Sequence, residues 1–221
     1  MSFFTSTIGR KFLMAITGIG LMAFVLAHML GNLQIFMGPE TFNGYAEMLR
    51  SMPGLLWTAR LGLLAFFVVH IVTAFSLTGT NRGSRVHRYA KNEKVQASLS
   101  SLYMLETGLV VLLFVLLHLA HFTFGFLQPE IFTAVDAAGR HDVYSIVIYG
   151  FQHVGYSVFY LFCVFMLGCH LHHGFQSVFQ TLGFNHPVYS PLVRRAGTAF
   201  AAVIFLGYAS IPLSVLAGVL G

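Results

Sequence analysis

Long apolar runs alternate along the chain with short polar connections. About 20 consecutive apolar residues are enough to cross the hydrocarbon core of a bilayer as a helix. Five runs reach this length, and they lie at about residues 12–36, 54–79, 99–126, 144–178 and 196–220. The pattern predicts an all-α integral membrane protein in which residues 1–221 form a single membrane domain, a bundle of five transmembrane helices.

The composition agrees with this prediction and narrows the class of protein. Hydrophobic residues make up 57% of the chain and charged residues only 9%, whereas a soluble domain carries roughly 25% charged residues. Because the apolar runs use most of the 221 residues, we expect no separate soluble domain within them. The expected surroundings are a lipid bilayer, and no nucleic-acid partner is expected.

The positions of the basic residues predict the orientation of the helices. Nine of the twelve Lys and Arg residues lie in the N-terminal head and in the second and fourth connections. These nine are Arg10, Lys11, Arg82, Arg85, Arg88, Lys91, Lys94, Arg194 and Arg195. Cytoplasmic loops of membrane proteins carry an excess of Lys and Arg. The N-terminus is therefore expected in the cytoplasm and the C-terminus outside.

Each of the first four runs carries a histidine, although ionisable side chains within membrane segments are costly and usually functional. His28 and His118 each lie about eight residues from the outer end of their run. His70 and His170 lie about nine and eight residues from the inner end. At a rise of 1.5 Å per residue, the two layers are about 10–15 Å apart in height. The histidines therefore sort into an outer and an inner pair.

Two histidines at one height, on facing helices of a bundle, are what a haem with two axial imidazoles needs. Such an iron has no open position for O₂, so it only passes electrons. The chain has no Cys-x-x-Cys-His sequence, which excludes c-type attachment. The sequence pattern leaves open whether His121 is a ligand in place of His118, and whether His173 is a ligand in place of His170. Hydrogen-bonded packing of each histidine, without any metal, is the simpler alternative.

Other polar residues are weaker candidates for a role at these pairs. Ser177 and Thr181 share the helical face of His170, and with Arg82 or Arg85 they are candidates for binding the propionates of an inner haem. Ordinary polar helix ends explain them equally well. At the outer mouth, Glu47 and Arg60 are candidates for binding a quinone, and the alternative is a solvated surface.

Four motifs, in order, resemble one family over almost the whole chain. They are GRKFLMAITGIGLMAFVLAHMLGNL at 9–33, FVVHI around His70, LLFVLLHLAHF around His118, and HLHHGFQSVFQTLGF from His170. They are similar to the cytochrome b558-type membrane anchor subunit of succinate:quinone oxidoreductases and quinol:fumarate reductases, of the single-chain, five-helix, dihaem kind. This resemblance implies His28 and His118 as ligands of an outer haem b, and His70 and His170 as ligands of an inner one. The His-x-x-x-Gly of His170 and Gly174 favours His170 over His173.

The resemblance also implies cofactors and partners. An iron–sulfur subunit and a flavoprotein subunit with covalent FAD are expected on the cytoplasmic face of a bacterial cytoplasmic membrane, and a dimer of this heterotrimer is one expected assembly. The chain would be the non-flavin subunit of the enzyme, carrying electrons between the iron–sulfur clusters and a quinone, with menaquinone as the expected one. Nothing in the chain indicates whether succinate is oxidised or fumarate reduced.

Two other functions fit parts of the pattern. The dihaem anchor of another respiratory enzyme, such as a nitrate reductase, would share the four ligands and differ in its catalytic partner. A haem-free transporter would use the histidines as a proton relay, and it predicts no Soret absorbance band. An optical spectrum of the dithionite-reduced protein separates this last hypothesis from the other two.

Overall fold

The computed structural model describes residues 6–83, 103–184 and 186–221, and leaves out the side chains of residues 82 and 83. Within these ranges all the regular structure is helical, and the only β-type pairing is an isolated bridge between Val135 and His141. Five helices are long and apolar enough to span a membrane. Four are α1 (Thr7–Leu33), α3 (Pro53–Gly83), α8 (Val154–Thr181) and α9 (Ser190–Leu216), and the third in chain order is α5 (Met104–His118) together with the helical turn that continues it to Thr123. The all-α class and the number of spans are thus confirmed, and they indicate a multi-pass membrane protein.

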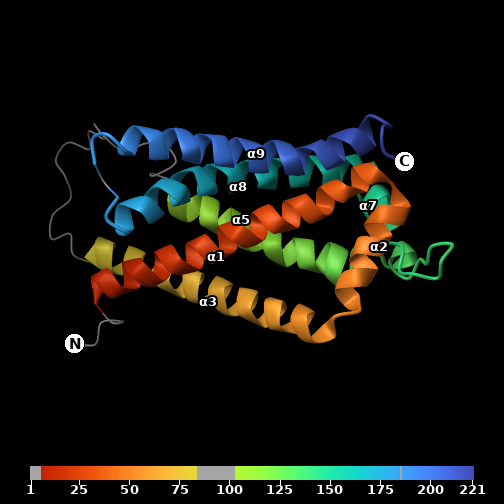
Figure 1. The fold of residues 1–221 in the computed structure, drawn as a ribbon, viewed down its shortest axis with the longest axis horizontal. Coiled ribbons are helices and arrows are strands. Elements are labelled where there is room, and N and C mark those ends of the chain that lie inside the picture. Colours follow the sequence, from red (N-terminus) through yellow and green to blue (C-terminus); the bar gives the residue numbers. More distant parts are fainter. Residues whose placement is uncertain (1–5, 84–102, 185) are drawn as a thin grey trace.

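The five long helices lie side by side along the long axis of the molecule (Figure 1). We call the end that carries the N-terminus the N end, and the opposite end, which carries the C-terminus, the C end; they are left and right in Figure 1. Successive spans alternate in direction. Helix α3 packs mainly against α1, α5 packs mainly against α8, and α9 covers α8 and α1. Which end faces the cytoplasm stays a prediction.

The fourth predicted run, 144–178, differs from the structure. It forms two helices, α7 (Val143–Gln152) and α8, which are separated at His153 by an extended backbone conformation. The Ser157 hydroxyl gives a physical reason for the break, because it donates to the carbonyl of Phe151 at the end of α7. At the other end of α7, Asp142 caps the helix by accepting a hydrogen bond from the Ser145 backbone. These bonds satisfy backbone groups that a helix end otherwise leaves without partners.

The first residues of the third predicted run, 99–102, lie outside the described residues. The run continues past α5 as a π-helix, labelled η3 (Leu119–Thr123). Single turns of π-helix are rare and are frequently found at functional sites. The last run begins earlier than predicted, because Pro191 is well placed in the first turn of α9, where its missing N–H costs nothing.

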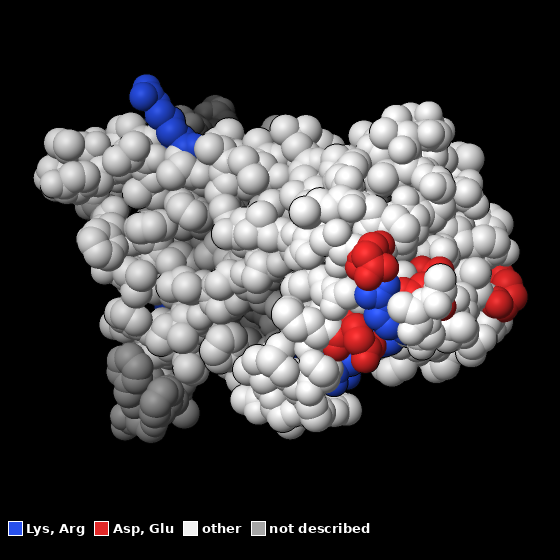
Figure 2. Space-filling model, turned by 45° about the vertical axis from the view of Figure 1, so that its right-hand side comes forward, with Lys and Arg blue, Asp and Glu red and all other residues white. Residues whose placement is uncertain are grey.

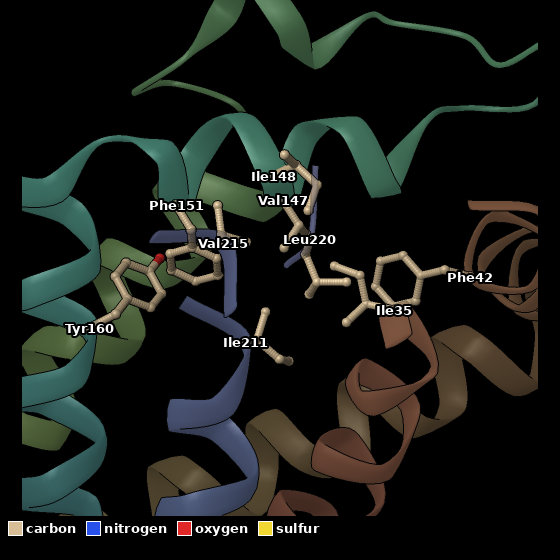
Figure 3. Packing of buried hydrophobic residues seen from close by; sticks show 9 residues of the cluster. All are labelled: Ile35, Phe42, Val147, Ile148, Phe151, Tyr160, Ile211, Val215 and Leu220. Carbon is tan, nitrogen blue, oxygen red and sulfur yellow. The ribbon is translucent and has the colours of Figure 1, made fainter. Parts of the chain in front are cut away.

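Short helices and loops form a cap over the C end. They are the 3₁₀-helix η2 (Gln34–Met37), α2 (Pro39–Arg50), α6 (Pro129–Phe132) and α7. Beneath them lies a cluster of buried apolar side chains, in which Tyr160 of α8 packs against Phe151 of α7, and Ile211 and Val215 of α9 lie close by (Figure 3). The C end is therefore closed by protein packing and does not rely on lipid alone.

A network of polar side chains holds the cap together. Arg140 donates to both Glu40 and Asp136, with the shortest nitrogen–oxygen distance 2.8 Å in each pair. Partial desolvation alone would raise the pKa of the Asp136 carboxyl, but hydrogen bonds from the Arg140 backbone and side chain and from Asn43 bring it below its ordinary value. The side-chain hydrogen bonds to Glu40 and then to Asp136 raise the pKa of Arg140. Stability from Asp136 is thus present above the pKa of the unfolded carboxyl, and it is lost as the pH falls through the lowered value.

Charged side chains gather at the C end in the view of Figure 2, where the sides of the bundle are free of them. The sides carry exposed apolar residues instead, such as Leu61, Leu64 and Val72 of α3 and Leu113 and Leu116 of α5. Apolar flanks with polar ends are what a bilayer requires of a spanning protein.

A substitution of Asn43 tests how much the polar network stabilises the cap, because this side chain is fully buried and joins α2 to the loop before α7. It donates to Asp142 at 2.9 Å and to Asp136 at 3.3 Å, and its oxygen accepts from the Tyr144 backbone at 2.9 Å. We expect Asn43→Ala to destabilise the protein by about 1–3 kcal/mol, since buried partners are left unsatisfied. Thermal unfolding of the purified protein in detergent measures this. The exposed Ser51→Ala, at the same end, is the control, and an equal transition in both variants would contradict the role of Asn43.

Candidate functional site

The four histidines of the first four spans lie in two pairs. The rings of His28 on α1 and His118 on α5 have centroids 5.9 Å apart and an interplanar angle of 81°. The rings of His70 on α3 and His170 on α8 have centroids 6.5 Å apart and an angle of 69°. We call these the C-end pair and the N-end pair. They are the same partners that the depth of each residue along its run had suggested.

The two pairs lie at different heights along α1. Thr17 of α1 contacts His70 of the N-end pair, and His28 follows Thr17 by eleven residues. At 1.5 Å per residue, this separates the two layers by about 16 Å along the helix axis. The bundle therefore holds two separate sites, one above the other.

The ring spacing suits a single metal between the members of each pair. A metal–imidazole bond is about 2 Å long, and the bonded nitrogen lies about 1 Å from the ring centre, so rings on opposite sides of one metal have centroids about 6 Å apart. Within the described part of the chain, no three His, Cys, Asp or Glu side chains are grouped to hold a bare metal ion. A metal held by one histidine pair thus needs its other ligands from a non-protein group. Haem iron is such a metal, since the porphyrin leaves only axial positions to the protein.

Hydroxyl groups hold the outer nitrogens of the N-end pair. Nδ1 of His70 lies 3.1 Å from the Thr17 hydroxyl, and Nδ1 of His170 lies 3.3 Å from the Thr107 hydroxyl. Both threonines are buried. Histidines that ligate metals almost always use their second nitrogen in such a bond, so this arrangement fits ligation through Nε2.

Aromatic rings surround the C-end pair. Phe24 stacks on the ring of His28 with centroids 5.3 Å apart. The other rings within about 6 Å of the pair are Tyr208, Phe114, Phe122 and Tyr160. Nδ1 of His118 is buried without a hydrogen-bond partner among the described residues. A buried ring nitrogen without a hydrogen-bond partner is costly. A role of this ring as a metal ligand would explain why the histidine stands in an apolar pocket.

His121 lies within the π-helix, and its ring binds other groups than the C-end pair. Its ring is fully buried and stacks on Phe122, and both ring nitrogens have partners. Nδ1 lies 3.1 Å from the Tyr160 hydroxyl, and Nε2 lies 3.0 Å from the Gln128 side-chain oxygen. Because neither nitrogen has a spare lone pair, the geometry favours His118 over His121 as a ligand. In α8, likewise, His170 and not His173 is the ring beside His70.

The predicted propionate residues lie towards the N end. Ser177 and Thr181 are half-buried near the end of α8. Arg85 and the side chain of Arg82 lie outside the described residues. The structure adds Arg10, whose guanidinium donates to the Ser76 hydroxyl at 2.6 Å and to the Thr80 hydroxyl at 3.1 Å.

Arg10 is not singled out by the sequence, where its position in the N-terminal head serves only as a topology signal. Its Nε is buried and has no hydrogen-bond partner among the described residues. Ser76, which binds the same guanidinium, follows His70 by six residues on α3. Arg10 therefore presents a partly buried positive charge with an unused donor on the N-end side of His70. A haem propionate is an anion that such a donor suits.

The predicted quinone residues do not line either of the two clefts found among the described residues. Glu47 is exposed on α2, and Arg60 is exposed over the ring of Trp57, 5.3 Å from its centroid. A cleft of about 580 Å³ lies elsewhere at the C end. It is lined by Leu117, Leu127, Gln128, Glu130, His153, Gly155, Tyr156 and Phe159.

Gln128 gives this cleft a polar group that sequence reasoning missed. In the sequence it is an ordinary polar residue at the start of a connection between two apolar runs. Its side chain is only 3% exposed, and its Nε2 has no hydrogen-bond partner among the described residues. Tyr156 and His153 line the same cleft, with ring centroids 5.7 Å apart. Tyr156 in turn lies 4.8 Å from the ring of His121, next to the C-end pair. The cleft thus combines a buried donor with a titratable imidazole.

Comparisons with protein-family models, with curated protein sequences and with solved structures give no match for this chain.

Proposed function

We propose that the protein is a dihaem cytochrome b, the membrane anchor subunit of a succinate:quinone oxidoreductase or quinol:fumarate reductase. One observation carries the proposal: two half-buried histidine pairs lie at two heights in a membrane bundle, each with the ring spacing of ligands to one metal. The four sequence motifs that resemble such anchors support the specific enzyme. The anchor of another respiratory enzyme is the alternative, and co-purification with a flavoprotein that oxidises succinate separates the two.

Each histidine pair would hold one haem at its own height in the bundle. His28 and His118 would hold one haem b, and His70 and His170 the other. When bound, the haems would supply one-electron transfer, and each would be held by its two histidines. Arg10 and Ser76 would bind propionates of the N-end haem, and the apolar bundle keeps water away from both irons.

Quinone chemistry is assigned to the cleft at the C end. A quinone that becomes a quinol takes up two electrons and two protons, and the reverse step releases them. Gln128 would donate a hydrogen bond to a quinone carbonyl oxygen. His153, exposed at the mouth of the cleft, would exchange protons with water.

The expected partner subunits complete the reaction. Succinate releases two electrons and two protons as it becomes fumarate, in the flavoprotein subunit, and iron–sulfur clusters carry the electrons to the N-end haem. Fumarate reduction is the same sequence run backwards. The basic residues of the N-terminal head and of the second and fourth connections make the N end the expected docking face for these subunits.

The choice between neighbouring histidines is tested by two substitutions. We expect His118→Ala to remove one of the two haems, because the C-end iron loses an axial ligand. His121→Gln is the matched control, and we expect it to keep both haems, since both nitrogens of His121 bind protein groups. Haem content per chain is measured from the dithionite-reduced absorbance spectrum. Two haems in His118→Ala and one in His121→Gln would reverse the assignment.

The location of the quinone site is tested by the rate at which a quinol reduces the haems. His153→Ala should slow this reduction by about 100-fold, because a positioned acid–base group contributes about that much. The dithionite-reduced spectrum should not change. Glu47→Gln and Arg60→Gln are the comparison variants at the same end of the bundle and outside the cleft. Slow reduction in these two, with normal reduction in His153→Ala, would return the site to the residues first predicted.

A further inference from the structure

The two histidines of the C-end pair lie at the ends of two similar sequence segments. Residues 17–28 read TGIGLMAFVLAH and residues 107–118 read TGLVVLLFVLLH, and the two stretches are identical at six of twelve positions. Each begins with a Thr-Gly step and ends with the histidine of the C-end pair. In each, the phenylalanine four residues before that histidine lies against its ring, with centroids 5.3 Å apart in one copy and 5.9 Å in the other.

The Thr-Gly steps meet equivalent partners. Thr17 of α1 contacts His70 of α3, and Thr107 of α5 contacts His170 of α8, in both cases between the threonine oxygen and Nδ1. Both histidine rings lie against the glycine of their step. A Cβ on Gly18 would make an ordinary contact, 3.6 Å from Cε1 of His70, whereas a Cβ on Gly108 would lie only 3.2 Å from Cε1 of His170, so the glycine eases the approach there. The helix pairs α1–α3 and α5–α8 thus share one contact, in which a threonine of the first helix holds the histidine of the second.

The threonine hydroxyls fix which ring nitrogen carries the proton. A hydroxyl has a single hydrogen. Thr17 donates its hydrogen to the Leu13 carbonyl at 2.7 Å, and Thr107 donates to the Met104 carbonyl at 3.1 Å. The hydroxyl oxygen therefore faces Nδ1 as an acceptor, so Nδ1 carries the hydrogen. In a neutral imidazole this leaves the lone pair on Nε2.

We propose that Thr17 and Thr107 are positioning residues for the haem of the N-end pair, which hold His70 and His170 in the tautomer that presents Nε2 to the iron. This inference rests on the proposed function. Second-sphere bonds of this kind orient a ligand and raise its basicity. The C-end pair has no threonine in this place: Nδ1 of His118 has no partner among the described residues, and the His28 ring lies beside the Asn32 amide nitrogen, 3.4 Å from Nδ1 and 3.3 Å from Nε2. Removal of either hydroxyl should therefore change one haem and leave the other as it is.

The experiment uses Thr17→Val and Thr107→Val in the full-length protein, since valine keeps the branched shape and lacks the hydroxyl. Haem content is measured by absorbance, and the midpoint potential of each haem by redox titration. A less basic ligand stabilises ferric iron less. We therefore expect both haems to be retained and the potential of one to rise, with a shift of about tenfold in its oxidised-to-reduced equilibrium, about 59 mV for one electron.

Two further variants make the result specific to the hydroxyl. Thr17→Ser and Thr107→Ser keep the hydroxyl and should restore the wild-type potentials. Thr73→Val removes another buried threonine, three residues after His70, which makes no bond to either ring, and it should shift neither potential.

Several outcomes would overturn the inference. Unshifted potentials in both valine variants, with two haems present, would contradict it and leave the proposed function standing. Should a valine variant lose a haem, the serine variant decides: retention with the wild-type potential supports the role of the hydroxyl, and loss in the serine variant as well refutes it. A wild-type chain that binds no haem would instead refute the proposed function itself.

Discussion

The structure depends on how four imidazole rings are accommodated inside an apolar bundle. A polar ring in a membrane interior is costly unless its nitrogens have partners. The protein meets this constraint by bringing the rings together in pairs from α1 with α5, and from α3 with α8. In the N-end pair the outer nitrogens bind threonine hydroxyls, and in the C-end pair the rings are enclosed by aromatic side chains. In the function that we propose, Nε2 of His70 and of His170 is the atom that would face the metal.

The two histidine pairs assign a role to each of the first four spans. The helix pairs α1–α3 and α5–α8 repeat one pattern, in which the first helix supplies a Thr-Gly step and one histidine, and the second helix supplies the other histidine. The histidines of the two first helices lie together, and so do those of the two second helices. Helix α9 has no copy, and it closes the bundle by packing against α8 and α1. The cap at the C end adds the cleft, next to the C-end pair, in which we place the quinone.

Much of this is open to prediction from the amino-acid sequence because a membrane restricts what a chain can do. The bilayer sets the length of the five spans and thereby the height of each histidine, so the hydropathy pattern alone matches His28 with His118. The break at His153 and the π-helix that turns His121 away are decided by local hydrogen bonds of particular side chains, which a hydropathy pattern does not contain. Arg10 and Gln128 escape prediction because only three-dimensional contacts show that their donors are buried. The repeated Thr-Gly step is visible in the sequence, and its meaning requires the contacts to His70 and His170.

The central claim is that each histidine pair holds one iron porphyrin, and the most direct test is the number of haems in the wild-type protein. The chain is purified from a haem-producing host, and its haem b is quantified by the spectrum of the pyridine complex together with iron analysis of the same sample. The account predicts two haem b groups and two iron atoms per chain. A folded chain that contains neither haem nor iron would contradict it.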